Sequence, residues 1–352
     1  MTRLGRALGV LLAVASVVAL AVPVVAEAGP TSAPAGVVTL RADPASVVPR
    51  LETGWLSVPD LGSGAHRVRV GVVPARGAEV AEVLFLHGHA DRLDNHPALF
   101  DELSRAGVRV VSFDLPSHGL TDAGPIDVWS FDDLSELAAR VGAATSTEDD
   151  TPFVLAGWSF GGLLATRIAQ SADLLAAFDR PVSGLALEVP ALAPYPAAGG
   201  DGVSRLRALT HDRSAPVAGP PSPASPLLDP LFAGRLLVEA ELASARPLPA
   251  GIPALVELSD PADDLYVDTA AVARWAMGRA AAAGADVTVR TCAGARHGLD
   301  FEAYPLGPAA RADLVDFVRA AAEGRPVIED RPSTHSSTTQ DPAVQKEVAP
   351  CR

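Results

Sequence analysis

The chain has 352 residues, of which 48% are hydrophobic, 20% charged and 5% aromatic. This apolar content is enough for a globular core, so it excludes a disulfide-stabilised miniprotein and a wholly disordered chain. With 28 Lys and Arg residues against 42 Asp and Glu residues, the formal net charge is −14, which disfavours an extended nucleic-acid-binding face because phosphate would be repelled.

The first predicted element is an export segment. Two arginines precede an uncharged apolar run over residues 7–26, which ends in the small-x-small pattern Ala26-Glu27-Ala28. These features predict a secretory signal peptide over residues 1–28. Because the run is nearly long enough to cross a bilayer, an uncleaved membrane anchor formed by residues 7–26 is the alternative. Both interpretations predict a folded part that is secreted or otherwise outside the cytoplasm.

The rest of the chain divides by composition. Residues 29–50 are rich in Pro, Ala and Val without a clear period and predict a flexible linker, and residues 325–352 predict a polar, poorly ordered tail. The main domain is expected over residues 51–324. In an exported chain, a disulfide between Cys292 and Cys351 would tie the tail to the domain, with two unpaired thiols as the alternative.

Within the main domain, short apolar runs alternate with helical patterns, which predicts an α/β fold with a mostly parallel, doubly wound sheet. The predicted strands are short and apolar enough for burial on both faces; they cover residues 83–86, 108–113, 153–156, 185–187, 254–258 and 287–289. The predicted helices cover residues 97–105, 131–141, 160–170, 269–282 and 309–321. An antiparallel hairpin of residues 55–58 and 68–73 is expected at the sheet edge.

One long interval interrupts this alternation. Residues 191–250 contain ten of the chain's 31 prolines, mixed with leucine and phenylalanine. A long insertion of this kind predicts a lid or cap over a pocket, because long loops in compact domains are usually functional. An ordinary irregular connection without ligand contact is the alternative.

A candidate nucleophile follows the third of the predicted strands. The sequence Gly157-Trp158-Ser159-Phe160-Gly161 lies between that strand and a helical pattern. G-x-S-x-G at such a turn forces the serine into a strained conformation, and larger side chains at the two glycines would collide with neighbouring backbone. Ser159 is therefore the candidate nucleophile. Trp158 is a candidate for the substrate pocket, with core packing as the alternative.

A serine hydroxyl is a weak nucleophile, so the chain should also supply a base and a carboxylate behind that base. Of the eight histidines, only His297 follows the last predicted strand in a short loop. His297 is therefore the candidate base, and a surface histidine is the alternative interpretation.

Four carboxylates follow the strand at residues 254–258. We select Asp263 as the acid of the triad, because a tight turn is expected at Asp260 and because Asp263 precedes the next helix, which Asp268 would cap. Asp260 and Asp264 are the alternatives, since spacing alone does not tell which carboxylate faces inward.

These residues resemble the α/β-hydrolase superfamily, and within it the monoacylglycerol lipase, lysophospholipase and esterase branch. The resemblance covers about residues 80–175 and 250–320; it rests on His87-Gly88, residues 113–119 and 130–134, the serine turn, and the later Asp and His loops. The chain order Ser, Asp, His also matches. The resemblance implies an oxyanion hole formed by the backbone N–H groups of His89 and Phe160.

The chain departs from the family pattern at two places. The family often has His-Gly-x-Gly where this chain has Ala90 in the last position, and Gly-His-Gly where this chain has Ser117 in the first. These changes leave the triad intact and bear on the shape of the oxyanion loop. The interpretation is therefore a serine esterase or lipase-like hydrolase that forms an acyl-enzyme on a small-molecule or lipid ester, with no cofactor and no metal.

Other functions compete with this interpretation. His87, His89 and Asp91 also resemble the H-x-H-x-D-H zinc motif of metallo-β-lactamase-fold hydrolases, with Arg92 at the last ligand position. A requirement for stoichiometric zinc would favour that interpretation. A peptidase or amidase on the same fold is a further alternative, as is a non-catalytic binding protein on a hydrolase scaffold.

Overall fold

The computed structural model describes residues 36, 38–62, 64–124, 126–146, 150–195, 230–325 and 349–351. The predicted signal peptide lies outside these ranges. So do residues 196–229, which hold most of the predicted Pro-rich lid, and residues 326–348 of the predicted tail.

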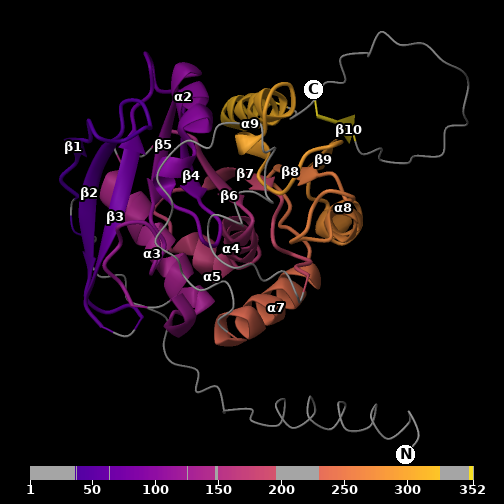
Figure 1. Ribbon diagram of the computed structural model, residues 1–352, viewed down its shortest axis with the longest axis horizontal. Coiled ribbons are helices and arrows are strands. Elements are labelled where there is room, and N and C mark those ends of the chain that lie inside the picture. Colours follow the sequence, from indigo (N-terminus) through magenta and orange to yellow (C-terminus); the bar gives the residue numbers. More distant parts are fainter. Residues whose placement is uncertain are drawn as a thin grey trace, which may run out of the picture. The chain divides into compact units, whose positions relative to one another are not determined.

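The described strands form one twisted sheet in the order β1-β2-β3-β5-β4-β6-β7-β8-β9-β10 (Figure 1). The strands β1 to β3 and β5 pair antiparallel, and every other neighbouring pair is parallel. Their bounds are β1 (Arg41–Ala42), β2 (Glu52–Val58), β3 (His66–Val73), β4 (Ala81–Leu86), β5 (Val108–Phe113), β6 (Phe153–Trp158), β7 (Val182–Glu188), β8 (Ala254–Ser259), β9 (Val287–Cys292) and β10 (Ala349–Pro350).

Helices cover both faces of this sheet. On one face lie α2 (Pro97–Arg105) and α9 (Leu306–Ala322), which also contact each other. On the other face lie α3 (Phe131–Thr145), α4 (Phe160–Ala169) and α8 (Thr269–Met277), with α5 (Ala172–Ala176) and α7 (Pro230–Ser244) packed against α4. Short 3-10 turns are η1 (Leu93–Asn95), η2 (Ile126–Val128), η3 (Ala280–Ala283) and η4 (Leu299–Phe301). Among the described helices, none is long and apolar enough to span a membrane.

Burial on both faces explains why the parallel strands could be identified from the sequence. Every residue of β4, β5, β6 and β8 is buried, because a hydrophobic cluster lies on each side of the sheet. A strand that packs on both faces needs a continuous apolar run, and the sequence supplies one. The predicted α/β class, the edge hairpin and the strand at residues 108–113 are confirmed.

The folded domain begins earlier than the predicted boundary at residue 51. Within the interval predicted as a flexible linker, β1 pairs with β2, and Val38 and Val48 are buried. These two valines join opposite clusters of the core, Val38 on one side of the sheet and Val48 on the other. Two single apolar residues in a Pro-rich stretch carry no period, so the sequence pattern could not reveal them.

The carboxyl end of the chain is joined to the opposite edge of the sheet. Strand β10 pairs in parallel with β9, and Cys351 forms a disulfide with Cys292, the last residue of β9. The two Cα atoms lie 4.9 Å apart, and Cys292 is buried. The predicted disulfide is therefore present, and it closes a loop that contains residues 326–348.

This disulfide should contribute to stability. We expect reduction, or the substitution Cys351→Ser, to lower the free energy of unfolding by about 2–4 kcal/mol, because the bond restricts the unfolded chain over a long loop. Urea denaturation followed by tryptophan fluorescence would measure the change. The reduced wild-type protein and the Cys351→Ser variant should agree, and an unchanged midpoint in both would contradict a structural role for the bond.

Candidate active site

Ser159 lies at the sharp turn between β6 and α4. Its backbone has φ 53° and ψ −114°, in the left-handed half of conformational space that non-glycine residues rarely adopt. The N–H of Ser159 donates to the carbonyl oxygen of Glu188 at the end of β7 (2.9 Å). The turn therefore holds the serine side chain above the carboxyl ends of the parallel strands.

The glycines beside this turn are required by the close approach of backbone. A Cβ atom at Gly157 would collide with the carbonyl of Gly161, and a Cβ atom at Gly161 would collide with the carbonyl oxygen of Leu86 on β4. A Cβ atom at Gly88, in the loop after β4, would meet the indole ring of Trp158 and approach the Cβ of Ser159. The loop that follows β4 thus lies directly against the serine turn.

The structure brings Ser159 and His297 together. The Nε2 atom of His297 lies 2.8 Å from the Oγ atom of Ser159, and its Nδ1 atom lies 2.8 Å from Oδ2 of Asp264. An ionised carboxylate only accepts hydrogen bonds, so the ring proton must be on Nδ1. This tautomer leaves Nε2 free to accept the proton of the serine hydroxyl, as a general base must.

Asp264 is held as an ionised, oriented acid. Its side chain has no exposed surface; its Oδ1 atom accepts the backbone N–H groups of Tyr266 (2.8 Å) and Val267 (2.9 Å). Burial opposes ionisation, but interactions with His297 and hydrogen bonds from Ser259 and Val267 keep the pKa of Asp264 below its usual value. Asp264 is therefore ionised at neutral pH, where His297 would act as a base.

The prediction of Asp263 as the acid behind His297 is wrong. The N–H groups of Asp263 and Asp264 both donate to the carbonyl oxygen of Asp260 (3.0 Å each), so the turn is one residue longer than expected, and Asp263 is exposed. Asp260 instead accepts backbone N–H groups of Ala262 and Gly294. Asp268 caps α8 as predicted.

Trp158 acts as a support beneath the site. Its ring is 3% exposed, and its indole N–H donates to the backbone carbonyl of His297 (2.8 Å). It also packs against Phe301 at 5.3 Å between ring centroids. The alternative of core packing is therefore the one that the structure favours over the substrate-pocket assignment. The hydrogen bond fixes the loop that carries His297.

Two buried histidines shape the loop that holds His89. The Nε2 atom of His87 accepts the N–H of Leu115 (3.0 Å), and that of His118 accepts the N–H of Ala90 (3.0 Å). Each Nδ1–H group donates to a backbone carbonyl, that of Gly88 or Pro116. Burial is the main factor that lowers the pKa of both rings to about 4, so both are neutral at pH 7.

The two departures from the family pattern coincide with unusual backbone. Ala90 has φ 59° and Ser117 has φ 60°, although left-handed conformations normally favour glycine. The N–H of Ala90 is fixed by His118, and the hydroxyl of Ser117 accepts the N–H of Ile126 (3.3 Å). The loops after β4 and β5 therefore keep glycine-type conformations without glycine, and hydrogen bonds offset their strain.

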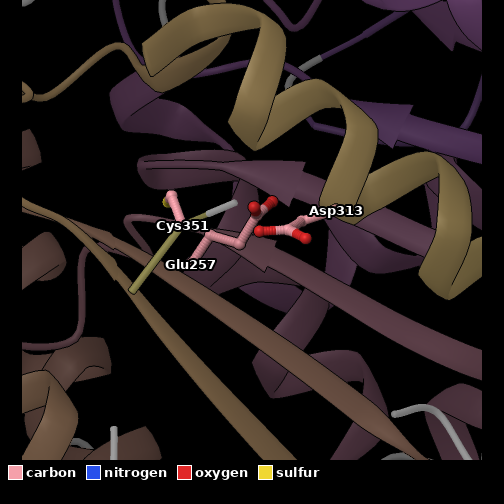
Figure 2. Close-up of side chains that lie close together, drawn as sticks. All are labelled: Glu257, Asp313 and Cys351. Atoms are coloured by element: carbon pink, nitrogen blue, oxygen red, sulfur yellow. The ribbon is translucent and has the colours of Figure 1, made fainter. Parts of the chain in front are cut away.

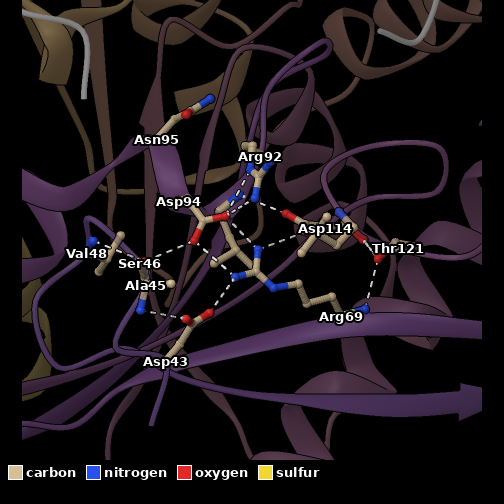
Figure 3. A network of polar contacts seen from close by, with 12 residues as sticks. Asp43, Ala45, Ser46, Val48, Arg69, Arg92, Asp94, Asn95, Asp114 and Thr121 are labelled. Atoms are coloured by element: carbon tan, nitrogen blue, oxygen red, sulfur yellow. Dashed lines mark hydrogen bonds and ion pairs between the residues drawn. The ribbon is translucent and has the colours of Figure 1, made fainter. Parts of the chain in front are cut away.

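A network of charges holds the same loop from the side of β3 (Figure 3). The buried guanidinium of Arg69 contacts Asp94 (2.6 Å) and Asp114 (3.3 Å), and Asp94 also pairs with Arg92. Asp114 accepts the backbone N–H of Leu93 (3.0 Å). These bonds connect the loop after β4 to the loop after β5, which explains the aspartate in the motif of residues 113–119.

His89 and Phe160, the two predicted oxyanion donors, both lie next to the serine turn. Phe160 is the first residue of α4, whose first-turn N–H groups have no partner within the helix. His89 follows Gly88, which lies against Ser159. The ring of His89 stacks on Phe232 of α7 at 4.3 Å, and burial together with the nearby His118 and His87 lowers its pKa well below the usual range.

The donor atoms in this region do not fit a zinc site. In the H-x-H-x-D motif, both nitrogens of His87 bond to backbone groups, and Asp91 bonds to Asn95 and His96. The only described cluster of metal-binding residue types is that of Glu257, Asp313 and Cys351 (Figure 2). The sulfur of Cys351 is already bonded to Cys292.

The two remaining groups of that cluster are carboxyl groups that face each other between β8 and α9 (Figure 2). Burial, together with the nearby carboxyl groups of Glu188 and Asp313, raises the pKa of Glu257 well above its usual range. The ionised form of Glu257 is therefore disfavoured, and a carboxyl group that resists ionisation, beside a disulfide, makes a poor set of metal ligands.

The sequence reasoning missed several polar residues beneath the site. Glu188 ends the otherwise apolar strand β7, and its Oε1 atom accepts the N–H of Asp300 (3.0 Å). His96 lies between Asp91 and Asp300. A carboxylate at the end of a buried strand is a signal that could have identified Glu188. No sequence signal connects His96 to Asp300, which lies 204 residues away.

The sequence model described as "Alpha/beta hydrolase family" matches residues 83–328. No curated protein sequence gives a significant match.

Several solved structures share the fold. A soluble variant of monoglyceride lipase from Saccharomyces cerevisiae, in complex with a substrate analog, has a TM-score of 0.55 at 16% identity and covers 75% of this chain and 95% of its own. A carboxyl esterase from Bacillus coagulans, in complex with glycerol, has a TM-score of 0.54 at 16% identity, with 78% and 99% covered. The monoacylglycerol lipase of Paleococcus ferrophilus has a TM-score of 0.53 at 15% identity, with 72% and 99% covered.

The position of Asp264 leads to a paired prediction. We expect Asp264→Asn to slow the reaction of Ser159 with a fluorophosphonate by about 10⁴-fold, because an amide in this place would hold His297 in the wrong tautomer. Asp263→Asn, one residue away and exposed, should react at the wild-type rate. Labelling rates measured by intact-protein mass spectrometry would test both variants. Slow labelling of Asp263→Asn with normal labelling of Asp264→Asn would instead identify Asp263 as the acid behind His297.

Proposed function

The chain belongs to the alpha/beta hydrolase family, and we propose that it is an exported serine hydrolase that cleaves carboxylic esters. The observation that carries this proposal is the continuous contact from Ser159 through His297 to Asp264, with 2.8 Å at each step. A nucleophile, a base and an orienting acid in this geometry are what acyl transfer requires. The names of the structural neighbours, among them lipases and an esterase, support ester substrates.

In the proposed mechanism, His297 removes the proton of Ser159 as the hydroxyl oxygen attacks the ester carbonyl. The backbone N–H groups of His89 and Phe160 stabilise the negative charge that develops on the carbonyl oxygen. Asp264 stabilises the imidazolium of His297, which then protonates the departing alcohol. Water, activated by the same histidine, attacks the acyl-enzyme and releases the acid.

We expect the acyl side of the substrate to be apolar. Phe232 and the ring of His89 stack beside the oxyanion loop, and Phe160 lies 5.4 Å from Phe232. On the other side, the N–H of Ala191 donates to the carbonyl of Ser159 (2.9 Å). The next residue, Leu192, lines a cavity of about 300 Å³, whose lining is mostly apolar and also includes Leu237, Val272, Trp275, Glu241 and Ser244.

The direct test is a fluorophosphonate labelling assay followed by hydrolysis of p-nitrophenyl esters of increasing chain length. We expect wild-type protein to label and to hydrolyse the esters, and Ser159→Ala to lose at least about 10⁴-fold in kcat, because no other group can accept the acyl chain. Ser57→Ala on the exposed face of β2 is the matched control. Absence of labelling would overturn the serine hydrolase in favour of a binding protein, and cleavage of anilides without esters would favour an amidase.

The proposal of export rests on the amino-terminal segment and on the Cys292–Cys351 disulfide, a bond that persists outside the reducing cytoplasm. Expression of the full chain in a bacterial host that secretes proteins should release a product whose amino terminus lies near Gly29. Mass spectrometry of the medium and the membrane fraction would measure this. A full-length chain in the cytoplasm would contradict the proposal.

A further inference from the structure

We propose that His96 is a positioning residue: as an imidazolium it joins the loop that carries the oxyanion donor to the loop that carries the catalytic base. This inference rests on the proposed function for its kinetic consequence, and its structural basis is independent of substrate. His96 follows η1 and precedes α2; its side chain has no exposed surface.

The contacts of the ring are with two carboxylates from distant parts of the chain. Its Nε2 atom lies 2.7 Å from Oδ2 of Asp91, and its Nδ1 atom lies 2.8 Å from Oδ2 of Asp300. Asp91 comes two residues after His89, and Asp300 comes three residues after His297. One ring therefore bridges the two loops on which the proposed chemistry depends.

With both carboxyl groups ionised, the geometry requires the ring to carry both protons. A neutral imidazole has one N–H donor and one lone pair, so one of its two nitrogens would face a carboxylate oxygen without a proton between them. Burial works against the charge, but the two carboxylates raise the pKa of His96 to about 10. Burial likewise opposes the ionisation of Asp91, but His96 lowers the pKa of that carboxyl group to about 2. The imidazolium is thus the form present at neutral pH.

Aromatic rings and other charged groups complete the surroundings. Four rings have centroids 4.6–6.0 Å from that of His96 and can stabilise a cation; they belong to Phe85, Phe100, Trp158 and Phe301. The titratable and charged groups that face it come from the loop after β4, from η4, from the end of β7 and from α9, namely Asp91, His87, Asp300, Glu188 and Arg311.

The bridge continues to the nucleophile. The carboxyl group of Glu188 accepts the N–H of Asp300, and the backbone carbonyl of Glu188 accepts the N–H of Ser159. Burial, together with the charge of Asp300, raises the pKa of Glu188 well above its usual range, which disfavours a second negative charge beside Asp300. Loss of the proton from His96 would therefore disturb both the loop of His89 and the loop of His297.

The experiment measures kcat for a chemically stable aliphatic ester as a function of pH, in wild type and in His96→Gln. We expect the wild-type kcat to fall at alkaline pH with a midpoint near 10. In His96→Gln we expect kcat at pH 8 to be lower by about 10–100-fold with little change in KM, because the base and the oxyanion donors lose their alignment. The alkaline fall should be absent in this variant.

A second variant covers the case in which His96→Gln does not fold. Asp91→Asn removes one of the two negative charges, so the pKa of His96 should drop and the alkaline fall should move to lower pH by about 1–3 units. His66→Gln, at the start of β3, is the matched control and should keep the wild-type profile. An unchanged midpoint in Asp91→Asn would overturn the proposal, because a merely structural histidine would alter stability and leave the pH profile in place.

A direct readout separates this inference from the proposed function. Long-range proton–nitrogen NMR of protein labelled at histidine nitrogen should find, at pH 8, one ring with protons on both nitrogens, and this signal should be lost in His96→Gln. The measurement needs no substrate. A neutral His96 at pH 8 would overturn the inference whatever the activity. A doubly protonated ring in a protein without esterase activity would contradict only the proposed function.

Discussion

Strained backbone at the carboxyl ends of neighbouring strands is the constraint on which the site depends. Four non-glycine residues with positive φ follow β4, β5, β6 and β7, namely Ala90 (59°), Ser117 (60°), Ser159 (53°) and Val189 (40°). Such conformations cost about 1–2 kcal/mol each, and they persist only where the surroundings over-determine them. The N–H of Ser159 is held by Glu188 and that of Ala90 by His118. Each strained residue is thus bonded to a neighbouring strand or loop, so the sheet fixes the reactive groups.

Burial favours the neutral form of each buried histidine in this protein, and the partners of the ring decide whether that preference is overcome. His87, His96 and His118 all have no exposed surface. Two of them accept a backbone N–H at Nε2 and donate from Nδ1 to a carbonyl, an arrangement that suits only the neutral ring. His96 meets a carboxylate at each nitrogen, which suits only the cation. The same residue type therefore serves as a neutral linker between backbone segments and as a charged link between side chains.

What the sequence predicted well was set by local physics. Continuous apolar runs identify strands buried on both faces, and the helix at residues 97–105 was located to the residue. G-x-S-x-G predicted the serine turn because the steric requirement is local. The sequence failed where one residue of turn geometry decides orientation, as with Asp263 and Asp264, and where partners are remote, as with His96 and Asp300. Trp158 was a pocket candidate because it lies beside Ser159. Its hydrogen bond to the loop of His297 is long-range, so the sequence could not reveal it.

Strain and charge in the loop after β4 are best understood together. Without glycine at position 90, this loop would relax toward ordinary backbone conformations unless both of its sides were held. Arg69 holds one side through Asp94, and His96 holds the other through Asp91. Buried ion pairs contribute little net stability, because desolvation offsets most of the attraction, and apolar residues of similar volume often do as well. An apolar replacement could preserve the stability of this region, but it would not specify where the loop stands relative to Ser159. The buried charges are therefore better explained by the position that they impose on the loop of His89, the proposed oxyanion donor, than by the stability that they add.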